Sequence, residues 1–110
     1  MVKYMSRILF LGALLIFSLA LSADAKLYGK WILTFDPDGP VTEDWMLFGE
    51  GSEVDLGDAE GVYLTCPYKV EKQSVIVICN VRGKTKQLVM SGKDNYRQLV
   101  NPSGAIYTRQ

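Results

Sequence analysis

The sequence predicts a small all-β fold, an antiparallel eight-stranded meander barrel with one cross-strand disulfide. After an apolar leader, the chain divides into eight short runs rich in β-branched and aromatic residues, which favour strands. The linkers are short and rich in Gly, Pro, Asn and Asp, so consecutive runs should pair with each other. Eight such strands favour closure, because a closed barrel has no free sheet edge. A sandwich and a Greek-key barrel remain as alternatives.

The first segment has the three parts of a secretory signal. Two basic residues precede an apolar run from Ile8 to Leu21, and Ala23-Asp24-Ala25 then supplies small residues at the positions that signal peptidase recognises. The apolar run is too short for a membrane span, which needs about 20 residues. We therefore expect cleavage near Ala25, a periplasmic or secreted protein, and a single domain over residues 26–110.

The predicted strands end where turn residues begin. In chain order they are Leu27–Phe35, Asp44–Phe48, Glu53–Leu56, Val62–Val70, Ser74–Val81, Thr85–Met90, Tyr96–Val100 and Ala105–Arg109. The turns between them are Asp36–Pro40, Gly49–Gly51, Gly57–Asp58, Glu71–Gln73, Arg82–Lys84, Gly92–Asn95 and Asn101–Gly104. Gly, Pro, Asn and Asp are favoured in turns for distinct backbone reasons, so these boundaries rest on chemistry as well as on polarity.

The first strand alternates large apolar residues with polar ones. At a period of two, Leu27, Gly29, Trp31, Leu33 and Phe35 share one face, which we expect to point into the core. A glycine in this row leaves room beside the indole ring or lets the strand bend.

The two cysteines test the register of the hairpin formed by the fourth and fifth strands. An even cysteine count in an exported chain favours a disulfide. A turn at Lys72-Gln73 places Cys66 directly opposite Cys79, within disulfide reach. The same register collects apolar residues on one face, namely Val62, Leu64, Cys66, Tyr68, Val70, Val75, Val77, Cys79 and Val81.

Pro67 leaves one detail of this hairpin open. A two-residue turn makes Pro67 a hydrogen-bonded partner of Ile78, although proline has no N–H to donate. A four-residue loop moves Pro67 to a non-bonded pair but turns the cysteines into a bonded pair, and a bulge near Pro67 is a third solution. The register also turns Tyr63, Ile76 and Ile78 outward, which predicts a contact surface unless another segment covers them.

Gly29-Lys30-Trp31 at the start of the first strand resembles the Gly-x-Trp motif of lipocalins and the wider calycin barrels. The segments "FGEGSEV" and "GVYLTC" and a closing Tyr are also similar to small bacterial lipocalin-like domains. The resemblance implies that Trp31 closes the barrel base under a late arginine, Arg109 or else Arg97. It also implies a carrier of a small apolar ligand, with a pocket lined by Trp31, Leu33, Phe35, Leu64, Tyr68 and Val77. Because lipocalins are nearly twice as long, the alternative is an interior filled by side chains.

A second resemblance involves two fragments. "YLTC" at Tyr63–Cys66 and "SGAIY" at Ser103–Tyr107 are similar to segments of the small periplasmic inhibitors of C-type lysozyme, which are also exported, disulfide-bridged barrels. In that family the Ser-Gly loop enters the lysozyme cleft, so the resemblance implies the same use for the loop at Ser103-Gly104.

Charge divides the chain into two halves of opposite sign. Residues 36–60 hold nine carboxylates and no Lys or Arg, whereas residues 69–110 hold eight basic residues and two acidic ones. The acidic side would carry Glu43, Asp44, Glu50, Glu53 and Asp55, and the basic side Lys84, Lys86, Lys93 and Arg97. Either the halves neutralise each other across the closure, or the polarised surface steers a charged partner.

These patterns favour a non-catalytic binding protein of the inhibitor or immunity type. The chain has no His, which removes Ser-His and Cys-His catalysis and His-based zinc sites, and Asp36–Gly39 lacks the further ligands of a calcium loop. We therefore expect no metal and no cofactor. We also expect no nucleic-acid partner, because the chain is near neutral in charge. The candidate residues for contact with a protein partner are Tyr63, Ile76, Ile78, Lys84, Lys86 and Arg97. The alternatives are the lipocalin-like carrier and the lysozyme inhibitor.

Overall fold

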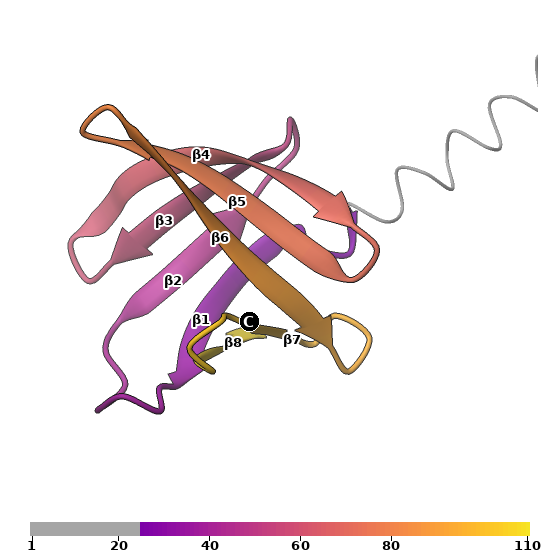
Figure 1. Ribbon diagram of the computed structural model, residues 1–110. Coiled ribbons are helices and arrows are strands. Elements are labelled where there is room, and N and C mark those ends of the chain that lie inside the picture. The colour runs from indigo at the N-terminus through magenta and orange to yellow at the C-terminus, as the bar shows by residue number, and fades with distance from the viewer. Residues whose placement is uncertain (1–24) are drawn as a thin grey trace, which may run out of the picture.

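The computed structural model describes residues 25–110, which form a closed barrel of eight antiparallel strands in sequence order (Figure 1). The strands are β1 (Gly29–Phe35), β2 (Asp44–Phe48), β3 (Glu53–Asp58), β4 (Gly61–Glu71), β5 (Ser74–Val81), β6 (Lys84–Lys93), β7 (Gln98–Val100) and β8 (Ile106–Arg109). The predicted all-β meander barrel is therefore confirmed. The predicted signal segment, apart from Ala25, lies outside the described residues. Within residues 25–110, no helix has the length and apolar character needed to cross a membrane.

The strand order gives the barrel two ends. The turns after β1, β3, β5 and β7 lie at one end, called here the tip end, and the turns after β2, β4 and β6 lie at the other, called here the base. Closure comes from β8, which pairs with β1, and from β7, which pairs with β6 and β8 through only three residues each. By contrast, β5 and β6 form eight pairs, and their hairpin reaches past the neighbouring strands (Figure 1).

The β4–β5 hairpin has the predicted register and disulfide. Glu71 pairs with Ser74 across the Lys72-Gln73 turn, and the cysteines are bonded with their Cα atoms 5.0 Å apart. The difficulty with Pro67 is resolved because the β4–β5 ladder ends before it, and Pro67 pairs instead with Glu53 on β3. The disulfide joins residues 13 positions apart in the sequence. In the chain-entropy model, closing a loop of this length stabilises the fold by about 3 kcal/mol.

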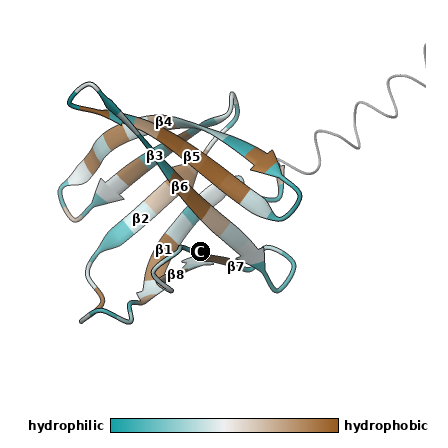
Figure 2. Cartoon of the chain, in the orientation of Figure 1, coloured by the Kyte–Doolittle hydropathy of each residue, from teal (hydrophilic) through white to brown (hydrophobic). Residues whose placement is uncertain are grey.

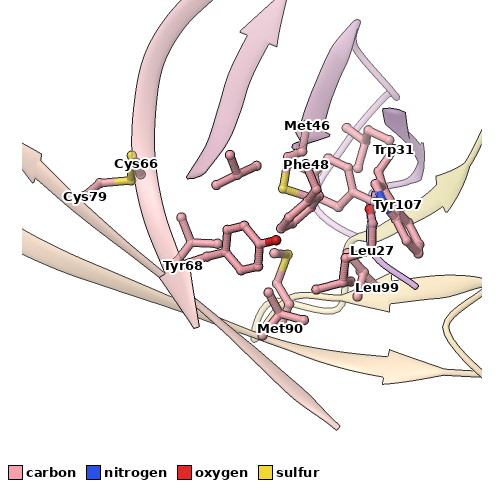
Figure 3. Close-up of a cluster of buried hydrophobic side chains, with 14 of the residues drawn as sticks. Leu27, Trp31, Met46, Phe48, Cys66, Tyr68, Cys79, Met90, Leu99 and Tyr107 are labelled. Carbon is pink, nitrogen blue, oxygen red and sulfur yellow. Dashed lines mark hydrogen bonds between the residues drawn. A yellow bond between two sulfur atoms is a disulfide. The ribbon is translucent and has the colours of Figure 1, made fainter. Parts of the chain in front are cut away.

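The core is a single cluster of side chains from all eight strands and the segment before β1 (Figure 3). Trp31 and Phe48 meet edge to face at 6.4 Å between ring centroids, and Phe48 meets Tyr68 at 5.0 Å. The indole N–H of Trp31 donates to the Leu27 carbonyl oxygen over 2.8 Å, so the buried ring leaves no polar atom unpaired.

Phe35 was predicted to face the core, and this prediction is wrong. The β1–β8 ladder shifts register between Leu33 and Phe35, so one extra residue of β1 turns Phe35 outward, where it is 50% exposed. A second shift beside Leu64 leaves Val62 54% exposed, although it was expected on the apolar face. Both bulges reverse side-chain facing in the same physical way.

The predicted seventh strand, Tyr96–Val100, is also too long. Asp94, Asn95 and Tyr96 all have positive φ, between 52 and 60°, so they form a left-handed turn and β7 begins only at Gln98. A left-handed backbone is costly for tyrosine, and tertiary contacts offset this cost. The Tyr96 ring lies where a side chain at Gly92 would be, and its hydroxyl donates to the Lys72 carbonyl oxygen over 3.0 Å.

Candidate binding surface

The residues predicted to line a ligand pocket lie mostly inside the packed core. Trp31, Leu33, Tyr68 and Val77 are buried there, and Leu64 packs partly buried against the same cluster. Phe35 is the exception, because its bulge turns it to solvent. The structure thus brings five of the six together in the hydrophobic core. Figure 3 shows Trp31 and Tyr68 among their core neighbours.

The base of the barrel carries the predicted arginine contact. The guanidinium carbon of Arg109 lies 5.1 Å from the centroid of the Trp31 ring, a favourable cation–π geometry. Arg109 therefore fills the position for which Arg97 was the second choice. An open recess of about 350 Å³ lies beside this base, and its lining includes Lys26, Gln73, Lys93 and Asn95.

The tip end contains a tyrosine–aspartate contact that the sequence did not suggest. The Tyr107 hydroxyl donates to the Asp44 carboxylate over 2.7 Å. Burial and then this hydrogen bond raise the pKa of Tyr107 well above its ordinary value of 10.0. The pKa of Tyr63 is also raised, by partial burial and then by the nearby Asp44 and Asp58, although Tyr63 is 59% exposed. The Tyr63 ring thus lies among acidic groups, apart from the basic residues with which it was grouped.

Trp45 is a second feature that sequence reasoning missed. Its ring lies over Gly57 of the paired strand, on the outside of the barrel, and its indole N–H donates to the Asp58 carbonyl oxygen over 2.9 Å. Lys30 places its ammonium 4.8 Å from the centre of the same ring. The sequence offered a tryptophan in the second predicted strand and a glycine in the turn predicted after the third, but pairing them needed the β2–β3 register, which continues through Gly57.

The β5–β6 hairpin brings together the other predicted contact residues. On its outer face Ile76 pairs with Val89 and Ile78 with Gln87, and both isoleucines are half-buried while Val89 is 42% exposed. Lys84 and Lys86 lie on the same hairpin close to the turn between β5 and β6, and both are exposed. Figure 2 shows the hydrophobic middle of this hairpin and its hydrophilic tip. Two predicted members, Tyr63 and Arg97, lie elsewhere.

The outer edge of β6 is open over most of its length. β7 pairs only with Ser91, Gly92 and Lys93, so the residues from Lys84 to Met90 have a strand neighbour only in β5. Lys84 closes a two-residue turn with Val81, and this makes the even-numbered residues of β6 the ones bonded to β5. The amide of Gly92, which donates to the Gln73 carbonyl oxygen over 2.7 Å, agrees with this alternation.

The backbone groups of Thr85, Gln87 and Val89 therefore point away from β5 toward the open edge. Within the part of the chain that the structure describes, no backbone hydrogen bond reaches them from another strand. A row of unpaired N–H and C=O groups of this kind is a template for another strand. Sequence reasoning missed this open edge because the edge results from the shortness of β7. That shortness depends on the left-handed turn before β7.

The cations of this hairpin are also without acidic partners. Among residues 25–110 the one salt bridge joins Lys69 to Glu71, so Arg82, Lys84 and Lys86 make none. Residues 81–90 contain no Asp or Glu. The same described region has no group of three or more His, Cys, Asp or Glu residues placed to hold a metal ion.

The chain matches no family model, and no curated protein or solved structure is significantly similar to it.

Proposed function

We propose that this protein is a non-catalytic binding protein that acts outside the cytoplasm by contacting another protein through the β5–β6 hairpin. The observation that supports this most is the open edge of β6, which combines unpaired backbone groups with three cations, Arg82, Lys84 and Lys86, that have no acidic neighbour in the hairpin. An exposed Val89 beside the half-buried Ile76 adds apolar area on the outer face of the same hairpin.

The carrier alternative has less support. Five of the six side chains proposed for its pocket pack in the core cluster, as the edge-to-face contact of Tyr68 with the core residue Phe48 illustrates. A ligand would have to displace close-packed aromatic groups, and a loss of packing of this kind is costly.

We also infer that the barrel is a shortened calycin-type barrel. The support is the Gly29-Lys30-Trp31 motif on β1 together with the arginine of the last strand against the indole ring, at 5.1 Å. The short strands are in keeping with an interior filled by side chains, since a small barrel has room for little else.

The proposed function is tested by affinity capture with residues 26–110 as bait and the periplasmic or secreted proteins of the source cell as prey. The variant Lys84→Glu/Lys86→Glu reverses two charges at the open edge. The matched control Lys93→Glu/Arg97→Glu reverses two charges at the base and has the same net charge. We expect one partner to be captured by the wild type and the control and lost by the edge variant. Equal loss in both variants, or no partner with any bait, would overturn the proposal.

Inhibition of C-type lysozyme is a second candidate, favoured by the rigidity of the loop between β7 and β8. One carboxamide oxygen, Oδ1 of Asn101, accepts hydrogen bonds from the backbone N–H groups of Ser103 and Ala105 and from the Ser103 hydroxyl. Pro102 and Ser103 are exposed at the tip end. A preorganised loop binds with a small entropic cost. The test is the rate of cell-wall lysis by lysozyme with and without the protein, and an unchanged rate at excess protein excludes this candidate.

A further inference from the structure

We propose that the open edge of β6 accepts an extended, acidic segment of the partner protein as an added antiparallel strand. This inference rests on the proposed function, which identifies the hairpin as the contact surface, and it names the chemistry of the partner. In this mode of contact, main-chain hydrogen bonds between the two strands give affinity and alternate side chains give specificity, as in other cases of strand addition.

The backbone supplies the first argument. Thr85, Gln87 and Val89 each present an N–H and a C=O to the same side, at alternate residues, which is the spacing that an incoming strand requires. Closure of the barrel does not cover them, because β7 ends its pairing with β6 at Ser91.

The side chains supply the second argument, because β6 offers different chemistry on its two faces. The even-numbered side chains face inward, from the buried Met90 through the half-buried Leu88 to the exposed Lys86 and Lys84. In an antiparallel added strand, side chains opposite these residues come close on the same face. An apolar residue would then lie beside Leu88, and carboxylates would lie beside the two lysines.

This alternation predicts a short pattern in the partner. Read from its N-terminus, the segment would have an apolar residue opposite Leu88, an acidic residue opposite Lys86 and another opposite Lys84, each separated by one residue. The intervening residues would lie opposite Gln87 and Thr85 and would contribute the main-chain hydrogen bonds to the edge.

Charge favours an acidic partner over a second copy of this chain. Pairing two β6 edges would gather Arg82, Lys84 and Lys86 from both copies into one sheet, and residues 81–90 contain no acidic residue to compensate them. Lysines on an edge strand are a common protection against self-pairing. They attract a carboxylate-bearing segment for the same electrostatic reason.

The test uses the synthetic peptide Ac-Thr-Val-Thr-Glu-Thr-Glu-Thr-NH2 and residues 26–110, with affinity measured by titration calorimetry at low salt. Two controls change one property each. In the first, both Glu are replaced by Lys. In the second, N-methyl groups are placed either on the Thr residues, whose N–H groups would face β6, or on the Val and Glu residues, whose N–H groups would not.

We expect the acidic peptide to bind, the lysine peptide to show no binding, and methylation of the Thr amides to weaken binding by about tenfold or more relative to methylation of the others. On the protein, Gln87→Pro removes an edge-facing N–H that β5 does not use, and should weaken binding while Gln87→Ala does not. Circular dichroism shows whether Gln87→Pro is folded, and the methylated peptides test the pairing even if it is not.

Three outcomes would overturn the inference: no binding of the acidic peptide, equal binding of the lysine peptide, or equal effects of the two methylation patterns. Concentration-dependent dimerisation that is lost in Gln87→Pro would assign the edge to a second copy instead. The proposed function fails separately, when the capture experiment finds no partner that depends on Lys84 and Lys86. A partner captured there without peptide binding leaves the function standing and rejects strand addition.

Discussion

Tyr107 and Asp44 lie far apart in the sequence and meet at the tip end of the barrel. Their hydrogen bond joins β8 to the start of β2 across β1, with the donor on a buried tyrosine and the acceptor on a half-buried aspartate. Such a bond to a charged acceptor is worth more than a neutral one. It therefore links two strands that do not pair directly.

The raised pKa of Tyr107 predicts how stability depends on pH. A tyrosine whose pKa is higher in the folded state stabilises the fold below the unfolded-state pKa near 10.0, and loses this contribution as the pH rises above that value. We expect the free energy of unfolding to fall above about pH 10, and Tyr107→Phe to reduce this fall while costing about 1 kcal/mol at neutral pH. Urea unfolding across this pH range measures both effects. The pKa of Tyr63 is raised less, so Tyr63→Phe should reduce the fall to a smaller extent. An alkaline slope equally changed, or equally unchanged, in both variants would contradict the assignment.

Gly57 and Trp45 should be coupled energetically. A side chain at Gly57 would overlap the Trp45 ring, so Gly57→Ala should destabilise the wild type by about 1–3 kcal/mol. In a Trp45→Ala background the ring is absent, and the same change should stabilise by about 0.5–1 kcal/mol because glycine is entropically unfavourable in a strand. A double-mutant cycle by urea unfolding gives both values. An effect of the same sign in both backgrounds would show that the ring is not the obstacle.

At the scale of the elements, the turn between β5 and β6 is under conformational stress. Arg82 and Gly83 have φ values of 54° and 77°, the left-handed pair of a type I′ turn. Asparagine is preferred at the first position, whereas arginine gains nothing there.

Arg82→Asn should therefore stabilise the fold by about 0.5–1 kcal/mol, measured as a shift in the urea midpoint. Lys84→Asn loses the same charge at a residue without positive φ and should not stabilise. Both variants should weaken binding of the acidic peptide, since both remove a cation from the edge. Equal stabilities of the two variants would mean that the turn conformation is not what limits stability.

The strands that pair with a sequence neighbour were predictable to a large extent. The β4–β5 register followed from Cys66, Cys79 and the Lys72-Gln73 turn, because a short linker leaves few alternatives. The outward turn of Phe35 was not predictable, since its bulge forms against β8, more than half the chain away. The start of β7 depended on the contact of Tyr96 with Gly92 and Lys72, which no local pattern reveals.

At the scale of the whole molecule, the barrel is unevenly closed. β5 and β6 share eight pairs, whereas β7 is joined by three pairs to each neighbour. Short ladders open at lower free energy than long ones, because fewer hydrogen bonds and contacts break together. The disulfide lies on the strongly paired side, between β4 and β5.

Native-state hydrogen exchange should detect this difference. We expect the amides of β7 and of its partners in β8 to exchange through a local opening of lower free energy than those shared by β5 and β6. The β6 amides at the open edge, such as Gln87, should exchange fastest among the strand residues, and the acidic peptide should slow them. Uniform protection around the barrel would contradict this account of closure.

The candidate site was only half accessible to sequence reasoning. Sequence reasoning could identify four of the contact residues, because charge and period-two facing are local properties. These four are Lys84, Lys86, Ile76 and Ile78. The open edge that gives them a common role depends on where β7 stops pairing with β6. Tyr63 was misplaced among them because it lies near Asp44 and Asp58.

The amino-acid sequence by itself determined the strand class, the meander order and the disulfide, since alternation, turn residues and short linkers act over a few residues. Only the tertiary structure decided which strands are bulged, how the barrel closes and which edge stays unpaired. These features depend on the mutual register of β1, β6, β7 and β8. Register between distant strands is chosen by packing of the whole core, and no local segment contains that information.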